Sequence, residues 1–82
     1  MVRLVFLGRL RAFGESGEVV LPQGVTTLAA LTAWLGQARP DLGAALASIR
    51  VQFAVNQVVV RDPSHIIADG DEIAFLPPMS GG

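Results

Sequence analysis

The sequence contains no cysteine and no lysine, and its 82 residues include a single histidine. Without cysteine the chain has no disulfides and no thiolate metal ligands, so its stability must come from well-packed apolar residues. Without lysine it has no side-chain amine, and an activated acyl group on this protein has only the N-terminus of its own chain to react with. The absence of cysteine leaves the redox compartment open, although a small secreted domain would more often be rich in disulfides.

Positive charge is sparse and dispersed. The net charge is −1, and the six basic side chains other than histidine are Arg3, Arg9, Arg11, Arg39, Arg50 and Arg61. Proteins that bind nucleic acid gather positive charge on one face to displace counterions, so no nucleic-acid partner is expected.

The longest stretch without a charged residue runs from Val19 to Ala38, a length that could suggest a membrane span. Pro22, Gln23, Gly24 and three threonines interrupt it, which favours a soluble segment. The apolar run behind Arg3 is too short for a signal peptide, and no small-residue cleavage site follows it. We therefore expect a cytoplasmic protein without membrane contact.

Hydrophobic periodicity in the first half predicts two strands and a helix. Residues alternate from Met1 to Leu10, with Val2, Leu4 and Phe6 on the core face and Arg3, Val5 and Leu7 on the other. A turn over 14–17 leads into a second strand over 18–21, which completes a hairpin. Thr26 or Thr27 caps an amphipathic helix that continues to Ala38. Pro40 ends it, and Asp41 starts a short second helical turn, weakened by Gly43.

Three more strands follow in the second half. Alternation over 50–56 predicts a strand with Val51, Phe53 and Val55 facing the core, and a tight turn at Asn56-Gln57 leads to a strand over 58–60. A turn at 69–71 leads to the last strand over 72–76, which two prolines end because they donate no ladder hydrogen bonds. This order predicts an α+β domain over 1–78, with one principal helix across a mixed sheet, and an extended tail over 79–82.

Conventional catalytic groups are nearly absent. His65 lies beside a proline-containing loop with few carboxylates near it, so it makes a poor metal ligand or catalytic base and is interpreted as a loop or packing residue. The acidic cluster over 69–72 is typical of a solvated turn. The glycines between positions 8 and 17 lack the spacing of a phosphate-binding loop. Trp34 falls on the apolar period of the helix, which favours core packing over ligand stacking.

The unusual feature is the segment from Pro77 to Gly82, which reads Pro-Pro-Met-Ser-Gly-Gly. The prolines extend the exit from the sheet, and the last two residues carry no side chain. One interpretation is an ordinary frayed terminus. The functional interpretation is a tail that enters a narrow enzyme cleft, because glycine permits close approach and unusual dihedral angles.

A family resemblance supports the functional interpretation. The segment from Asp69 to Gly82 resembles the terminal signature of the small, sulfur-carrying subunit of molybdopterin synthase, and Ala54-Val55-Asn56-Gln57 resembles an internal strand and turn of that family. Length and the region from Phe6 to Arg11 agree as well, so the resemblance spans nearly the whole chain. It implies a ubiquitin-like β-grasp fold of about five strands, in which the last strand lies in the middle, parallel to the first.

The resemblance also implies a chemistry at Gly82. A partner adenylyltransferase that uses ATP and magnesium activates the terminal carboxylate, and a persulfide then displaces AMP to leave a thiocarboxylate. Activation is needed because that carboxylate, with an ordinary pKa of about 3.3 to 3.7, is ionised and a poor electrophile. Gly81 keeps the tail narrow for threading. The carrier itself would supply no catalytic side chain and bind no cofactor or metal.

In the family's next step, the tail enters the large synthase subunit, in a heterotetramer, and passes its sulfur to a cyclic pyranopterin precursor. An extended segment from Pro77 to Gly82 spans at most about 20 Å, enough to reach a neighbouring active site. Strand parity places apolar residues on the outer face, which marks an interface unless a loop of the same chain covers it. The residues expected to contact the partner are Leu7, Val59, Leu76, Pro77, Pro78, Met79 and Ser80.

Other functions fit the same sequence. Carriers for thiamine synthesis and tRNA thiolation share the fold and the Gly-Gly ending, although they tend to be shorter and to lack the Pro-Pro segment. A ubiquitin-like modifier would let a target lysine attack activated Gly82. A plain interaction domain would carry the Gly-Gly ending by accident. The choice of sulfur acceptor belongs to the partners, so the sequence leaves these alternatives open.

Overall fold

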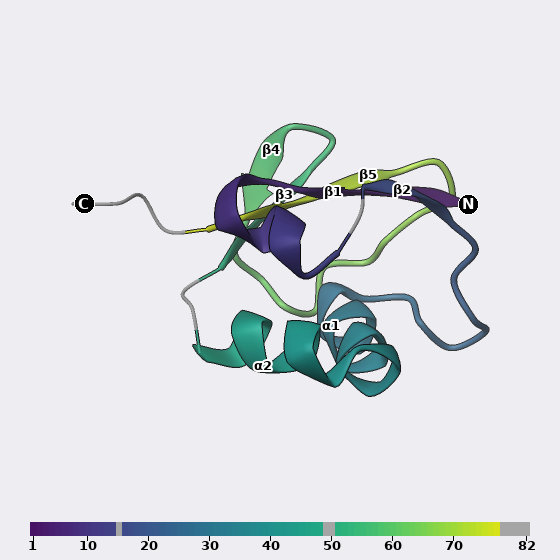
Figure 1. The fold of residues 1–82 in the computed structure, drawn as a ribbon. Helices are drawn as coiled ribbons and strands as arrows, with labels where there is room; N and C mark the ends of the chain where they lie inside the picture. The colour runs from purple at the N-terminus through teal and green to yellow at the C-terminus, as the bar shows by residue number, and fades with distance from the viewer. Residues whose placement is uncertain (15, 49–50, 78–82) are drawn as a thin grey trace.

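In the computed structural model, which describes residues 1–14, 16–48 and 51–77, five strands form one mixed sheet. The strands are β1 (Val2–Phe6), β2 (Gly17–Val19), β3 (Gln52–Val55), β4 (Val58–Val60) and β5 (Glu72–Leu76), in the order β2-β1-β5-β3-β4. β5 lies in the middle, parallel to β1 and antiparallel to β3 (Figure 1). This confirms the predicted place of the last strand.

Two helices cover one face of the sheet (Figure 1). In α1 (Leu28–Ala38), Thr27 is the N-cap, and its hydroxyl oxygen accepts the Ala30 N–H at 3.1 Å. None of the helices in the described ranges is long and apolar enough to cross a membrane.

The second helix is longer than the single turn predicted from the sequence. α2 runs over nine residues, Pro40–Ser48. Gly43 was expected to weaken it, but a Cβ at Gly43 would lie only 2.6 Å from the Gly36 Cα. The two glycines therefore let α2 pack closely on α1, and this tertiary contact offsets the low helix propensity of glycine.

The core lies between the sheet and the helices and centres on aromatic rings. Phe75 is completely buried, and its ring stacks on Phe6 with the centroids 4.7 Å apart. Phe53 meets Phe75 edge-on at 5.4 Å. Trp34 packs against this core, as predicted, and the other large core residues are Val2, Leu4, Leu10, Leu28, Leu31, Leu35, Leu42, Leu46, Val55, Ile67 and Ile73.

The prediction of a strand from Met1 to Leu10 was wrong in its second half. β1 ends at Phe6, and Gly8–Ala12 forms a 3₁₀ helix, η1. Gly8 turns the chain with a positive φ of 57°, and Leu10 is then completely buried in the core. Two other predicted strands are shorter than expected, since β2 ends at Val19 and β3 covers only 52–55.

The turn between β3 and β4 is tied to the start of β5. Asn56 and Gln57 both have positive φ, 51° and 71°, as a two-residue hairpin turn of type I′ requires. The Asn56 side chain donates to Asp71 Oδ1 at 2.9 Å and accepts the Glu72 N–H at 3.0 Å. The Ala68 N–H donates to Asp71 Oδ2 at 2.8 Å and holds the pKa of that carboxyl below its usual value. The acidic turn therefore has a structural role.

Candidate functional site

A row of small apolar residues crosses the sheet on the face opposite the helices. The strand register places Val5 beside Ala74, Ala74 beside Ala54, and Ala54 beside Val59. Their sequence neighbours, Phe6, Phe75 and Phe53, pack in or against the core. Because successive side chains of a strand point to opposite faces, the row lies on the outer face and spans four strands.

Two leucines extend this row toward the end of the sheet where the chain leaves β5. Leu76 lies two residues beyond Ala74 and is half-buried. Leu7 continues β1 in an extended conformation, and its N–H donates to the Phe75 carbonyl at 3.2 Å. We call the set Val5, Leu7, Ala54, Val59, Ala74 and Leu76 the outer apolar row.

Exposure and neighbouring charge favour an interface on this row. Leu7 is 38% exposed and Val59 is 49% exposed, so no described loop covers these two side chains. Toward the start of β1, Arg3 lies between Glu18 and Glu72 in the neighbouring strands, which gives the row a charged border. An apolar patch with a polar rim is typical of a protein interface.

The predicted partner-binding residues fall into two groups. The register places Leu7, Val59 and Leu76 together on the outer face, as strand parity predicted, and Pro77 follows directly after them. Pro77 is half-buried, with its ring against Gly8. The residues Pro78, Met79, Ser80, Gly81 and Gly82 lie outside the described residues. Ala54 belongs to the row although sequence reasoning did not single it out, because its place depends on pairing with β4 and β5.

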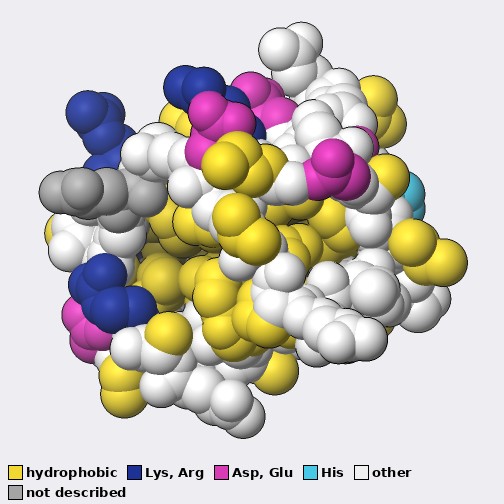
Figure 2. Space-filling view, turned by 90° about the vertical axis from the view of Figure 1, so that its right-hand side faces the viewer, with side chains coloured by type: hydrophobic (Ala, Val, Ile, Leu, Met, Phe, Trp, Pro, Cys, Tyr) yellow, Lys and Arg dark blue, Asp and Glu magenta, His cyan; other side chains and the backbone are white. Residues whose placement is uncertain are grey.

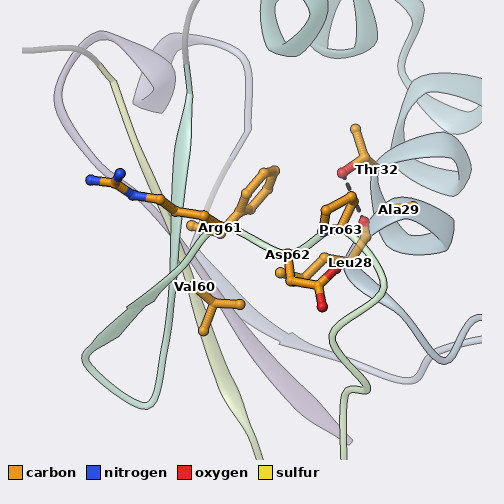
Figure 3. Close-up of a pocket in the computed structure, with 8 residues that line it drawn as sticks. Leu28, Ala29, Thr32, Val60, Arg61, Asp62 and Pro63 are labelled. Atoms are coloured by element: carbon orange, nitrogen blue, oxygen red, sulfur yellow. Dashed lines mark hydrogen bonds between the residues drawn. The ribbon is translucent and has the colours of Figure 1, made fainter.

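A cavity of about 160 Å³ lies on the other side of the sheet, between α1 and the end of β4. Figure 3 shows its lining, with the Arg61 guanidinium directed away from α1. The Thr32 hydroxyl donates to the Leu28 carbonyl at 2.9 Å. Ser64 donates its hydroxyl and N–H to Asp62 and lowers the pKa of that carboxyl. The Thr32 and Asp62 side chains are therefore bonded within the chain, and the described residues that line the cavity include no converging catalytic groups.

His65 lies next to this cavity as a loop residue. Its N–H donates to the Asp62 carbonyl at 3.0 Å, and its own carbonyl accepts the Leu28 N–H at 3.2 Å. The residue thus fastens the loop to the start of α1, in line with its interpretation as a loop residue. Over the described ranges, no three histidine or acidic side chains are grouped to hold a metal ion.

A second hollow, of about 420 Å³, lies at the end of the sheet that carries Met1. Hydrophobic side chains gather around it (Figure 2), and its lining includes Val2, Leu21, Val25 and Ile67. It lies at the opposite end of β5 from Pro77, so it cannot form one continuous site with the chain that leaves β5.

Comparisons with known proteins agree with this geometry. The family model described as the ThiS family matches residues 4–82. The molybdopterin synthase sulfur carrier subunit of Escherichia coli is 29% identical over 82 residues, which is 100% of both chains. A solved complex of subunits 1 and 2 of molybdopterin-converting factor from Helicobacter pylori contains a chain that is 27% identical, with a TM-score of 0.73 and coverage of 99% of this chain and 97% of that one.

A third likeness concerns the fold alone. SAMP1 from Haloferax volcanii is 20% identical, with a TM-score of 0.73 over 99% of this chain and 98% of that one. Together these findings confirm the ubiquitin-like β-grasp fold and the resemblance that the sequence predicted.

Proposed function

Because the chain belongs to the ThiS family, we propose that it is a sulfur carrier for the synthesis of molybdopterin. The observation that carries the proposal is the similarity to a relative named as the sulfur carrier subunit of molybdopterin synthase, which extends over the whole of both chains. The Helicobacter pylori structure is a complex of two subunits, and this supports a large-subunit partner, which we propose joins the carrier in a heterotetramer.

The proposed chemistry takes place at Gly82. In an adenylyltransferase that holds ATP and magnesium, the Gly82 carboxylate attacks the α-phosphorus of ATP and pyrophosphate leaves. A persulfide sulfur then attacks the acyl carbon and AMP leaves, and a thiol cleaves the resulting sulfur–sulfur bond to give the thiocarboxylate. The absence of cysteine supports this assignment, because no side chain of the protein can hold a transferable sulfur.

The outer apolar row supports a partner that covers the sheet and takes the tail at the same time. Leu7, Leu76 and Pro77 lie at the end of the sheet where the chain leaves β5, and the row runs from there across to Val59. We propose that the large subunit docks on this row and receives Pro78 to Gly82 in its active site, where the sulfur passes to a cyclic pyranopterin precursor. The catalytic side chains then come from the partner.

Mass spectrometry of the full chain tests the proposal. With the adenylyltransferase, ATP, magnesium and a sulfur source, the peptide that ends at Gly82 should gain the mass expected for the replacement of one oxygen by sulfur. Addition of the large subunit and the pterin precursor should restore the carboxylate as a dithiolene product appears. Gly81→Glu serves as the matched control, since its tail should not enter the activating cleft.

Different outcomes point to different functions. An unchanged mass in the presence of all components would reject the carrier chemistry. Attachment of Gly82 to a lysine of another protein would identify a modifier. Loss of sulfur only when tRNA becomes thiolated, or only when the thiamine thiazole forms, would keep the carrier chemistry and reject the role in molybdopterin synthesis.

A further inference from the structure

We propose that Gly8 is a positioning residue for the tail, because its bare Cα seats the Pro77 ring and thereby sets the direction in which the chain leaves β5. The inference rests on the proposed sulfur-carrier function, and it extends docking on the outer apolar row from the large subunit to the adenylyltransferase. The exit direction then decides how often Gly82 reaches the activating site after the row has docked.

The contact between Gly8 and Pro77 leaves no room for a side chain. A Cβ at Gly8 would lie 2.8 Å from Pro77 Cγ and 3.7 Å from Pro77 Cδ. The proline ring is closed onto its own backbone nitrogen, so Cγ cannot swing aside as the end of a flexible side chain does. Gly8 also has a φ of 57°, a conformation that glycine adopts without steric cost.

Both backbones that meet at this contact are fixed to the core. On the side of Gly8, Leu10 is completely buried and its N–H donates to the Leu7 carbonyl at 3.1 Å. On the side of Pro77, Phe75 is completely buried and its carbonyl accepts the Leu7 N–H at 3.2 Å. Because both sides are anchored up to the contact, an added Cβ must be accommodated by Pro77 and by the residues that follow it.

A small change at Pro77 is amplified along the tail. A fully extended segment of five residues, 78–82, spans at most about 17 Å, so in a tail threaded in that form a turn of about 10° at Pro77 would move the far end by about 3 Å. Misplacement of a reacting group by about 1 Å can reduce a rate by about 100-fold. The outer apolar row stays unchanged, and docking should therefore persist while delivery of Gly82 fails more often.

Two variants at Gly8 introduce the clash. Gly8→Ala adds the Cβ alone. Gly8→Asn also adds a Cβ, but asparagine tolerates a positive φ, so this variant separates the clash with Pro77 from backbone strain. It replaces Gly8→Ala in the assay if Gly8→Ala does not fold. Gly70→Ala is the matched control, because Gly70 has a φ of 90° but no atom within 4 Å of its added Cβ.

The measurement is ATP–pyrophosphate exchange by the adenylyltransferase over a range of carrier concentrations, below the melting transition of every variant. For both Gly8 variants kcat should fall by about tenfold or more, with KM within about twofold of the wild-type value. Gly70→Ala should match the wild type. A merely structural role for Gly8 would lower the melting temperature and leave both kinetic constants unchanged.

Several results would overturn the inference. These are wild-type kinetics for both Gly8 variants, a raised KM with unchanged kcat, or an equal loss in Gly70→Ala. Absence of exchange with the wild type would instead reject the proposed function. The contact between Gly8 and Pro77 is then tested by NMR alone. A nuclear Overhauser effect between the Gly8 α protons and the Pro77 γ protons supports the contact, and the absence of this effect overturns the inference.

Discussion

Phe75 and Leu76 are neighbours in β5 whose side chains lie on opposite faces, so substitutions at the two positions separate stability from docking. Phe75 is 0% exposed and packs against both Phe6 and Phe53. Phe75→Ala removes a buried ring and leaves a cavity, which should cost about 3–5 kcal/mol. Each aromatic pair accounts for about 0.5–1.5 kcal/mol of that loss.

The loss at Phe75 is large relative to the stability of so small a domain. A chain of 82 residues is expected to have a free energy of unfolding of about 4–12 kcal/mol. In a domain of this size each 1 kcal/mol shifts the melting temperature by about 4–8 °C, so Phe75→Ala should lower it by at least about 12 °C. A fraction of the molecules should be unfolded at room temperature.

Leu76→Glu should have the opposite profile. Leu76 is half-buried on the outer face, opposite Gln52, and a carboxylate there can remain hydrated in the free carrier. Its effect on stability should be about 1 kcal/mol or less. Covered by an apolar partner surface, the same charge would lose its hydration, and we expect affinity for the large subunit to fall by about tenfold or more.

Thermal melts and partner-binding titrations on the same preparations test both expectations. Val58→Glu is the control for an added charge, because Val58 is 65% exposed and lies opposite Val55, outside the outer apolar row. If Leu76→Glu melts early while Phe75→Ala keeps the wild-type melting temperature, the assignment of the two faces is reversed. Equal loss of binding in Val58→Glu and Leu76→Glu would refute docking on the row.

The remaining predictions concern the helix pair, the acidic turn and the tail. Gly43→Ala should destabilise the domain by about 1–2 kcal/mol in urea unfolding because of its contact with Gly36, whereas Gly36→Ala, whose Cβ meets Gly43 at 3.4 Å, should be near neutral. Asp71→Asn should lower the free energy of unfolding most at neutral pH. The Ala68 N–H lowers the Asp71 pKa in the folded state, so the stabilisation by the Asp71 carboxylate is present above the ordinary pKa of 3.8 and disappears as the pH falls through the lower folded value. Thermal melts that show the same difference from the wild type at every pH would contradict this. Gly81→Glu should keep the wild-type circular dichroism spectrum and lose ATP–pyrophosphate exchange, and normal exchange would refute tail threading.

Local periodicity was enough to predict most of the sheet. The alternation of Val2, Leu4 and Phe6 placed the core face of β1, and the turn before residue 72 together with the prolines after residue 76 set both ends of β5. These signals lie within a few residues of one another, so no knowledge of distant contacts was needed.

The features that were missed depend on contacts between distant segments. Gly8 bends the chain into η1 because Leu10 can reach the core there, and α2 is stable because Gly43 packs on Gly36. Helix propensity alone disfavours a helix at Gly8 and at Gly43. Strand parity predicted which residues of the outer face are apolar. The row across four strands, however, follows from the register between β3 and β5. No short turn connects these two strands, so local sequence does not determine their register.

The central place of β5 links the stability of the domain to the delivery of the tail. Ile73 and Phe75 point into the core, whereas Ala74 and Leu76 belong to the outer apolar row, so the two roles alternate along one strand. Because side chains alternate with a period of two, a shift of one residue in β5 would turn Phe75 outward and Leu76 inward. It would also move Pro77 away from Gly8. The spacing from Phe75 to Pro77 therefore has to satisfy core packing, partner docking and tail exit together, so we expect that an insertion or deletion in this segment would disrupt all three.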